Sequence, residues 1–263
     1  MISNNKSYNE DSVFKPENLL REARRQKSFR HGTVPKVCVL DPDGDILSYL
    51  QKTEQVKSID YWACYHTKMY VFNYNDIEVG IIGNAVGASF AVLLAEQMFV
   101  SGCELLISIT SAGIINQPKN ESEFILITKA LRDEGTSYHY IPPSEFSELS
   151  SELVELLKSL VKNKKLSVEN GTSWTTDAPY RETNSAIQIA KSMHINVVEM
   201  ESAALYAFAQ AKNKQVVCFA HLTNTMAQDE GDFEKGEENG SIKALELIYA
   251  AAVSLIYSKD QRF

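Results

Sequence analysis

Short apolar runs and amphipathic stretches alternate along most of this chain. The apolar runs are rich in Val, Ile and Leu and are bounded by polar turns, which is typical of strands buried on both faces. They are Val37–Leu40, Glu104–Thr110, Phe124–Thr128, Asn196–Glu199 and Val216–Leu222. A further pair, Met69–Tyr74 and Ile77–Ile82, flanks Asn75 and Asp76 and predicts a β-hairpin.

Helical periodicity occupies most of the segments between these strands. Val86–Val100 places Ala91, Leu94 and Met98 on one face of a predicted helix. The other predicted helices are Pro16 to about Gln26, Phe146–Val161, Ser202–Ala211 and Gly240–Tyr257. Strands separated by helices predict an α/β fold of three layers, α/β/α, around a central mixed, mostly parallel sheet. Ligands of such sheets bind beyond the carboxyl ends of the strands, so the turns there are the candidate site.

Composition narrows the class of protein. The 263 residues contain no Pro-, Gly- or Ser-rich linker, so we expect one domain over 1–263, with 1–30 as a helical N-terminal extension. The formal net charge of -8 leaves no broad basic face, so neither nucleic acid nor a membrane surface is an expected partner. Met1–Asn9 lacks the apolar core of a secretory signal, and no apolar run approaches the length of a membrane span. Four cysteines without a CxxC pair predict reduced core thiols in the cytoplasm.

Two carboxylates mark the boundary between a predicted strand and a predicted helix. Glu199 and Glu201 flank Met200 where the apolar strand gives way to a helix of small residues. Charged groups next to a core need partners, which suggests a binding site. The alternative interpretation is that Glu201 only stabilises the positive end of the helix dipole.

The run Val-Glu-Met-Glu-Ser-Ala-Ala at 198–204 resembles the ribose-binding signature of the nucleoside phosphorylase superfamily. That family includes uridine phosphorylases, hexameric purine nucleoside phosphorylases and methylthioadenosine nucleosidases. The resemblance implies that Glu199, Met200 and Glu201 bind substrate: Met200 packs on the sugar, and Glu201 accepts hydrogen bonds from the ribose hydroxyls. An ionised carboxylate can accept both vicinal hydroxyls at once, and such charge-assisted bonds are strong.

Other matches follow in the family's order from about Val37 to Tyr257. Gly83–Ser89 resembles the family's glycine-rich turn, and Ser108–Gly113 resembles the strand end that meets phosphate. The resemblance implies that Gly113 contacts substrate. It also implies a phosphate site at four residues: Gly44, Gly83, Thr110 and Ser111.

The segment Trp174–Glu182 falls where the family places its base-binding loop. Trp174 or Tyr180 could stack on a nucleobase, and Arg181 could hydrogen-bond its edge. A core position for Trp174 and a surface salt bridge for Arg181 are the alternatives. Asn224 stands where purine-cleaving members carry an Asp; because an Asn cannot deliver a proton, this favours a uridine-type substrate.

The arginines that hold phosphate in phosphorolytic members of the family are absent. Their places fall at Gly44, at Ser108 and near Tyr70 or Val71, and none of these is Arg. Lys68, Lys129 and Arg132 are conceivable replacements. The Asp41–Asp45 run lacks the Gly and Glu spacing of a calcium loop, and the five histidines show no ligand spacing, so no metal or cofactor is expected.

Three functional hypotheses follow, with Glu201, Arg181 and Asn224 as the catalytic candidates. The first is phosphorolysis of a uridine-type nucleoside, with inorganic phosphate as co-substrate. The second is hydrolysis by a nucleosidase, which would explain the missing arginines, and the third is nucleoside binding without turnover. By resemblance we expect a homo-oligomer, a dimer or hexamer, in which His31 could reach a neighbouring site.

Overall fold

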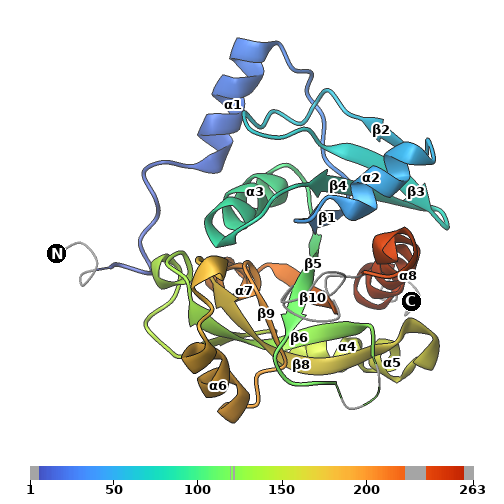
Figure 1. The fold of residues 1–263 in the computed structure, drawn as a ribbon. Coiled ribbons are helices and arrows are strands. Elements are labelled where there is room, and N and C mark those ends of the chain that lie inside the picture. The colour runs from blue at the N-terminus through green and yellow to red at the C-terminus, as the bar shows by residue number, and fades with distance from the viewer. Residues whose placement is uncertain (1–5, 119, 121, 223–234, 258–263) are drawn as a thin grey trace.

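The computed structural model describes residues 6–118, 120, 122–222 and 235–257, and its strands and helices alternate as predicted (Figure 1). The strands are β1 (Val37–Asp41), β2 (Val56–Ser58), β3 (Tyr70–Tyr74), β4 (Ile77–Gly83), β5 (Leu105–Ile114), β6 (Phe124–Asp133), β7 (Phe146–Glu148), β8 (Val168–Thr176), β9 (Val197–Glu199) and β10 (Gln215–Leu222). The α-helices are α1 (Pro16–Lys27), α2 (Asp45–Lys52), α3 (Ala88–Val100), α4 (Ser151–Leu156), α5 (Lys158–Lys162), α6 (Asn184–Ser192), α7 (Ser202–Lys212) and α8 (Ser241–Ala252).

All described strands join one mixed sheet, as predicted. Its order is β10-β6-β8-β9-β5-β1-β4-β3-β2, with β7 added on β6 and a further pairing of β10 with β5. That last pairing closes five strands, β5, β10, β6, β8 and β9, into a ring. The neighbours β4, β1, β5 and β10 are all parallel, so their carboxyl ends lie at one edge.

Helices cover both faces of the sheet and complete the predicted three layers (Figure 1). On one face α3 packs against α7, and α1 packs on the outside of α3. On the other face α2 packs against α8. The seven residues from Ser202 to Phe208 are buried without a break, because the small side chains of α7 let it lie directly on the strands.

One predicted helix is wrong. Within Phe146–Val161 the first residues form β7, which pairs with Lys129–Leu131 of β6, and only the later part is helical, as α4 and α5. The hydroxyl of Ser147 donates to the Ala203 carbonyl (2.7 Å), which fixes the strand on α7. Ser150 then caps α4 by accepting from the Leu153 N–H (3.3 Å). Amphipathic spacing alone does not register the pairing of β7 with β6 or the tertiary bond of Ser147.

The N-terminal helix and the cysteine assignment agree with the sequence. α1 begins at Pro16 and buries Leu20 and Ala23 against Ala63. All four cysteines are free and buried.

The expectation that no segment approaches the length of a membrane span needs correction, because the helical run Glu237–Ile256 is long and apolar enough to cross a membrane, with a mean hydropathy of 1.2. Half of this run is buried in the protein, as in the core helix of a globular domain.

The hydroxyl of Tyr206 joins two strands in the centre of the core. It donates to the Ile127 carbonyl of β6 and accepts from the Cys218 N–H of β10 (3.1 Å). We expect Tyr206→Phe to lower the free energy of unfolding by roughly 1–3 kcal/mol, because both backbone groups would lose a buried partner. Urea unfolding checks this, with Tyr74→Phe in the β3–β4 hairpin as the control. Equal stability of wild type and Tyr206→Phe would contradict the role of the hydroxyl.

Candidate active site

Four chain segments meet at the carboxyl edge of the parallel strands. They are the turn after β1, the turn after β4, the last residues of β5, and the junction of β9 with α7. Hydrogen bonds between segments far apart in sequence hold them together, from Gly87 to Glu201 and from Ser111 to Asp43. The structure therefore brings Glu201, Ser111 and the turns that contain Gly44 and Gly83 together at this edge of the sheet.

Glu199 is a structural carboxylate. It is buried and fully engaged: one oxygen accepts from the Thr175 hydroxyl (2.5 Å), and the other accepts from the N–H groups of Glu201 and Ser202 (both 2.8 Å). It thus satisfies the first N–H groups of α7 in the manner of a helix cap. Its bond to the Glu201 N–H holds the backbone of Glu201 in place.

Glu201 is buried but only half satisfied. Its side chain is 1% exposed, and Oε1 accepts from the Gly87 N–H (2.7 Å). Among the described residues, Oε2 has no hydrogen-bond partner. The Thr110 hydroxyl, although it donates to the Ser111 carbonyl (3.3 Å), lies close enough to lower the pKa of Glu201. A buried carboxylate oxygen without a partner is rare in a folded protein and is free to accept bonds from a ligand.

Burial and neighbouring charges raise the pKa of Glu201. Loss of hydration is the largest cause, followed by the negative charge of Glu199, and Asp43 adds a smaller effect in the same direction. The Gly87 N–H opposes them, and the resulting pKa is about 8. The helix-dipole alternative does not explain a raised pKa, because the positive end of a helix stabilises the ionised form and lowers the pKa of a carboxyl group. A buried carboxyl group whose pKa is raised in this way is typical of functional sites.

Asp43 accepts two hydrogen bonds from Ser111, in the last part of β5. Its Oδ2 accepts from the Ser111 N–H (2.6 Å), and its Oδ1 accepts from the Ser111 hydroxyl (2.8 Å). Lys235 lies beside it, 3.5 Å from Asp43 and 2.5 Å from Asp45. The two donors of Ser111, predicted to bind phosphate, are therefore held by a carboxylate of the same chain.

Two glycines allow the turns after β1 and β4 to touch. Gly44 has a φ of 79°, and a Cβ there would lie 2.5 Å from the Asn84 side-chain oxygen. A Cβ on Gly83 would lie 2.9 Å from Leu47. The buried carboxylate of Asp41 accepts from the N–H groups of Gly44 and Leu47, and burial raises its pKa to about 7. Gly44 and Gly83 thus border the site through their backbone packing.

The residues predicted to bind the base lie in different surroundings. Trp174 is buried in a small cluster with Val198, and its indole N–H donates to Asp133 (2.9 Å). Trp174 is therefore a core residue, as the alternative interpretation of the sequence predicts. Tyr180 is fully exposed, and Arg181 beside it is also exposed. Met200 and Gly113 are both half-buried, next to the acidic pair and on β5 respectively. Asn224 lies outside the described residues.

Of the three conceivable replacements for the missing arginines, Arg132 and Lys129 contact other groups of the protein and Lys68 is exposed. Arg132 is buried, and its guanidinium donates to Ser137, to Ser144 and to the Pro142 carbonyl. Lys129 pairs with Glu148 (3.7 Å), and Lys68 and His31 are exposed. Among the described residues, no group of three or more His, Cys, Asp or Glu is arranged to hold a metal ion. Lys235 is the described cation that contacts this site, and sequence reasoning missed it.

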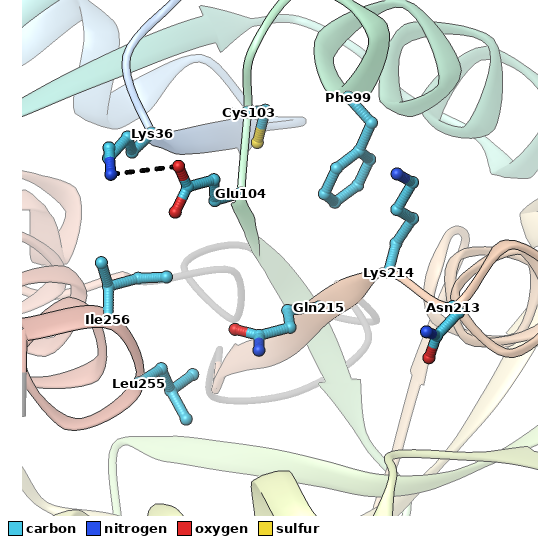
Figure 2. A pocket seen from close by; sticks show the side chains of 9 residues that line it. All are labelled: Lys36, Phe99, Cys103, Glu104, Asn213, Lys214, Gln215, Leu255 and Ile256. Atoms are coloured by element: carbon cyan, nitrogen blue, oxygen red, sulfur yellow. Dashed lines mark ion pairs between the residues drawn. The ribbon is translucent and has the colours of Figure 1, made fainter. Parts of the chain in front are cut away.

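A cavity of about 420 Å³ lies at the opposite edge of the sheet (Figure 2). It is bordered by residues that precede or begin β5 and β10, including Cys103 and Gln215. Lys36 pairs with Glu104 at its rim (3.1 Å), and Lys214 lies over the Phe99 ring. The amino ends of the strands open here, so the cavity is separate from the site around Glu201.

Two contributors were hidden from sequence analysis. Gly87, in the glycine-rich turn, has a φ of 96° and directs its N–H at Glu201. In the sequence, Asp43 stands out only as a member of the Asp41–Asp45 run, which lacks the spacing of a calcium loop. The alternating acids at the end of β1 were a visible signal, but the partner of Asp43 is 68 residues away in sequence.

Comparison with known proteins identifies the family. The family model described as "Phosphorylase superfamily" matches residues 36–255, and the chain belongs to this superfamily. A purine nucleoside phosphorylase, DeoD-type, of Mycoplasma genitalium is 27% identical over 168 residues, which cover 61% of this chain and 69% of the relative. An uncharacterised protein of Acanthamoeba polyphaga mimivirus is 27% identical over 161 residues, covering 61% and 60%. The match thus spans roughly two thirds of these relatives' lengths.

Solved structures show the same fold. Uridine phosphorylase from Vibrio fischeri superposes with a TM-score of 0.68 at 18% identity, covering 87% of this chain and 93% of the other. Purine nucleoside phosphorylase from Toxoplasma gondii gives a TM-score of 0.70 at 14% identity, covering 88% and 93%. The predicted fold class and superfamily are both confirmed, and the chain is a nucleoside phosphorylase-type protein by family.

The raised pKa of Glu201 predicts a pH-dependent effect of its replacement. Between the ordinary value of 4.5 and about 8, the folded protein holds a proton that the unfolded chain releases, so this group lowers stability as pH rises. Glu201→Gln cannot titrate there. We expect its stability relative to wild type to increase by up to about 1.4 kcal/mol per pH unit across that window.

Urea unfolding at pH 5 and pH 8 measures the difference. The control is Glu78→Gln, on the exposed face of β4, whose effect should be the same at both pH values. A Glu201→Gln effect that does not vary with pH would show that Glu201 is ionised throughout the range.

Proposed function

We propose that this protein cleaves the N-glycosidic bond of a ribonucleoside whose ribose diol binds to Glu201. The observation that carries the proposal is the buried Oε2 of Glu201, which lacks a partner among the described residues. Membership of the superfamily and the names of the relatives support it.

The geometry of Glu201 suits a diol better than an anion. The Gly87 N–H holds one carboxylate oxygen, and Glu199 fixes the backbone behind it, so the free oxygen has a set direction. Two vicinal hydroxyls would donate to the carboxylate and stabilise its ionised form, which burial and the charge of Glu199 disfavour. A neutral sugar adds no charge to a region already rich in acids.

Cleavage would proceed by lengthening of the bond between C1′ and the base. The sugar becomes oxocarbenium-like, and the base leaves with the electron pair of the broken bond. Glu201 would orient the sugar, while Arg181 and Asn224 would stabilise the developing negative charge on the base. Tyr180, being fully exposed, offers a face on which the base could stack.

Two nucleophiles are compatible with this step. Phosphate would give ribose 1-phosphate, and the names of the relatives favour it. Water would give free ribose, and the engagement of Ser111 by Asp43 favours it. Base release measured with and without inorganic phosphate distinguishes them. Tight nucleoside binding without cleavage under either condition would indicate a binding protein instead.

Two observations favour different bases. Asn224 favours a uridine-type substrate, whereas the curated relatives carry purine names. Uridine and inosine are therefore the two substrates to compare. A homo-oligomer, dimer or hexamer, and a cytoplasmic location complete the proposal by resemblance to the family, and sedimentation of the purified protein tests the assembly.

Replacement of Glu201 tests the diol contact directly. We expect Glu201→Gln to lower kcat/KM by about a hundredfold, since bonds from the hydroxyls to a charged acceptor are replaced by weaker ones to an amide. The same substitution should have little effect on a 2′,3′-dideoxynucleoside, which lacks the donors. An equal loss on both substrates would show that Glu201 acts only through structure.

Tyr180 and Arg181 can be tested without disturbing the fold. Both side chains are exposed, so Tyr180→Ala and Arg181→Ala should leave the melting temperature unchanged. If they bind the base, each should raise KM by about tenfold, the effect of losing roughly 1.4 kcal/mol of stacking or hydrogen bonding. Ile189→Ala, at an exposed apolar position on α6, is the control. Wild-type KM in both variants would exclude this loop from the site.

A further inference from the structure

The end of β5 forms an anion receptor that is already filled. The N–H and the hydroxyl of Ser111 point at the two oxygens of one carboxylate, that of Asp43, at 2.6 Å and 2.8 Å. A backbone N–H beside a hydroxyl is the kind of donor pair that binds a phosphate oxygen. Here both donors are used within the chain.

A cation completes this internal unit. Lys235 lies 3.5 Å from Asp43 and 2.5 Å from Asp45, and its side chain is only 13% exposed. The carboxylate of Asp43 therefore has two hydrogen-bond donors and a counter-ion. Asp43 lies within a tight turn after β1, in which the Gly44 N–H donates to the Asp41 carbonyl (3.0 Å), and this turn fixes the position of Asp43.

An incoming phosphate would meet the carboxylate of Asp43, which pairs with Lys235, and two further buried acidic groups beside it. Asp43 occupies the donors, and Asp41 and Glu201 are buried close by, each with a pKa raised in part by Asp43. Phosphate would have to displace Asp43 into this acidic surrounding while bringing further negative charge of its own. Arg132 and Lys129, two of the cations that the sequence offers as replacements for the missing arginines, contact other partners.

We propose that Asp43 is the resident anion of this subsite, that it excludes inorganic phosphate, and that it thereby makes water the nucleophile. This rests on the proposed function for the identity of the reaction. The oxygen of water bonds to C1′, the bond from C1′ to the base breaks with its electron pair on the base, and the base gains the proton that water loses. Asp43 is a specificity-determining residue here, and no contact between it and the sugar is required.

Removal of the carboxylate should open the subsite. The test compares the full-length wild type with Asp43→Ala, which vacates the Ser111 donors, and Asp43→Asn, which keeps the shape but removes the charge. Asp45→Ala is the matched control, because Asp45 also pairs with Lys235 but does not contact Ser111. Calorimetric titration with inorganic phosphate measures binding, and the sugar product is identified as ribose or ribose 1-phosphate.

We expect wild type and Asp45→Ala to release base at a rate that phosphate does not change. Asp43→Ala should bind phosphate at least about tenfold more tightly than wild type, with a smaller gain in Asp43→Asn. Ribose 1-phosphate formed by wild type would overturn the proposal, since phosphate would then displace Asp43. Unchanged phosphate affinity in both folded Asp43 variants would overturn it as well.

Failure of this inference and failure of the proposed function would give different results. Phosphate titration needs neither a nucleoside nor turnover, so a gain of affinity in Asp43→Ala supports the filled subsite even if no nucleoside is cleaved. If Asp43→Ala fails to fold, Asp43→Asn carries the same comparison, because an amide can keep one acceptor on Ser111. Nucleoside cleavage by a wild type that also binds phosphate would leave the proposed function intact and reject the inference.

Discussion

Two buried carboxylates at the junction of β9 and α7 constrain the rest of this site. Removing two charges from water two residues apart is unfavourable unless each finds partners. Glu199 finds them in the Thr175 hydroxyl and two N–H groups, whereas Glu201 has one N–H, from Gly87. The difference separates a carboxylate that builds the helix start from one kept available for a ligand.

The same constraint explains why the neighbouring turns contain glycine. Gly87 must adopt a positive φ to direct its N–H at Glu201, and a side chain there would meet open space, so the requirement is conformational and not steric. Gly44 is limited in both ways, since its φ is also positive and a Cβ would collide with Asn84. The site is thus set by backbone geometry as much as by its acids.

Sequence analysis predicted the parts of this structure that depend on local pattern. The apolar strands, the hairpin and α3 follow from periodicity, and the rule for carboxyl ends directs attention to the turn that contains Glu201, whereas Ser111 follows from the family resemblance. β8 was not predicted because buried positions such as Ser173, Thr175 and Thr176 are polar and are satisfied or covered only in the fold. β7 was read as helix because its pairing with β6 is a tertiary contact.

The role of Asp43 could not be predicted for the same kind of reason. A carboxylate at a strand end reads as a turn residue or a metal ligand until its partner is known, and that partner lies on another strand. The family resemblance even pointed the other way, since it assigned Ser111 to phosphate. The missing arginines and the added carboxylate become one observation only in three dimensions.

Charge limits which ligands the carboxyl edge of the sheet can accept. The edge around Glu201 gathers Asp41, Asp43 and Glu201, with Lys235 as the described cation in contact with it. An uncharged nucleoside can donate its hydroxyls to such a surface without adding repulsion, whereas any anion must first break the bonds between Asp43 and Ser111. The proposed function and the proposed role of Asp43 therefore rest on one physical argument: a neutral sugar adds no charge at this edge, whereas a phosphate competes with the carboxylate that already binds Ser111.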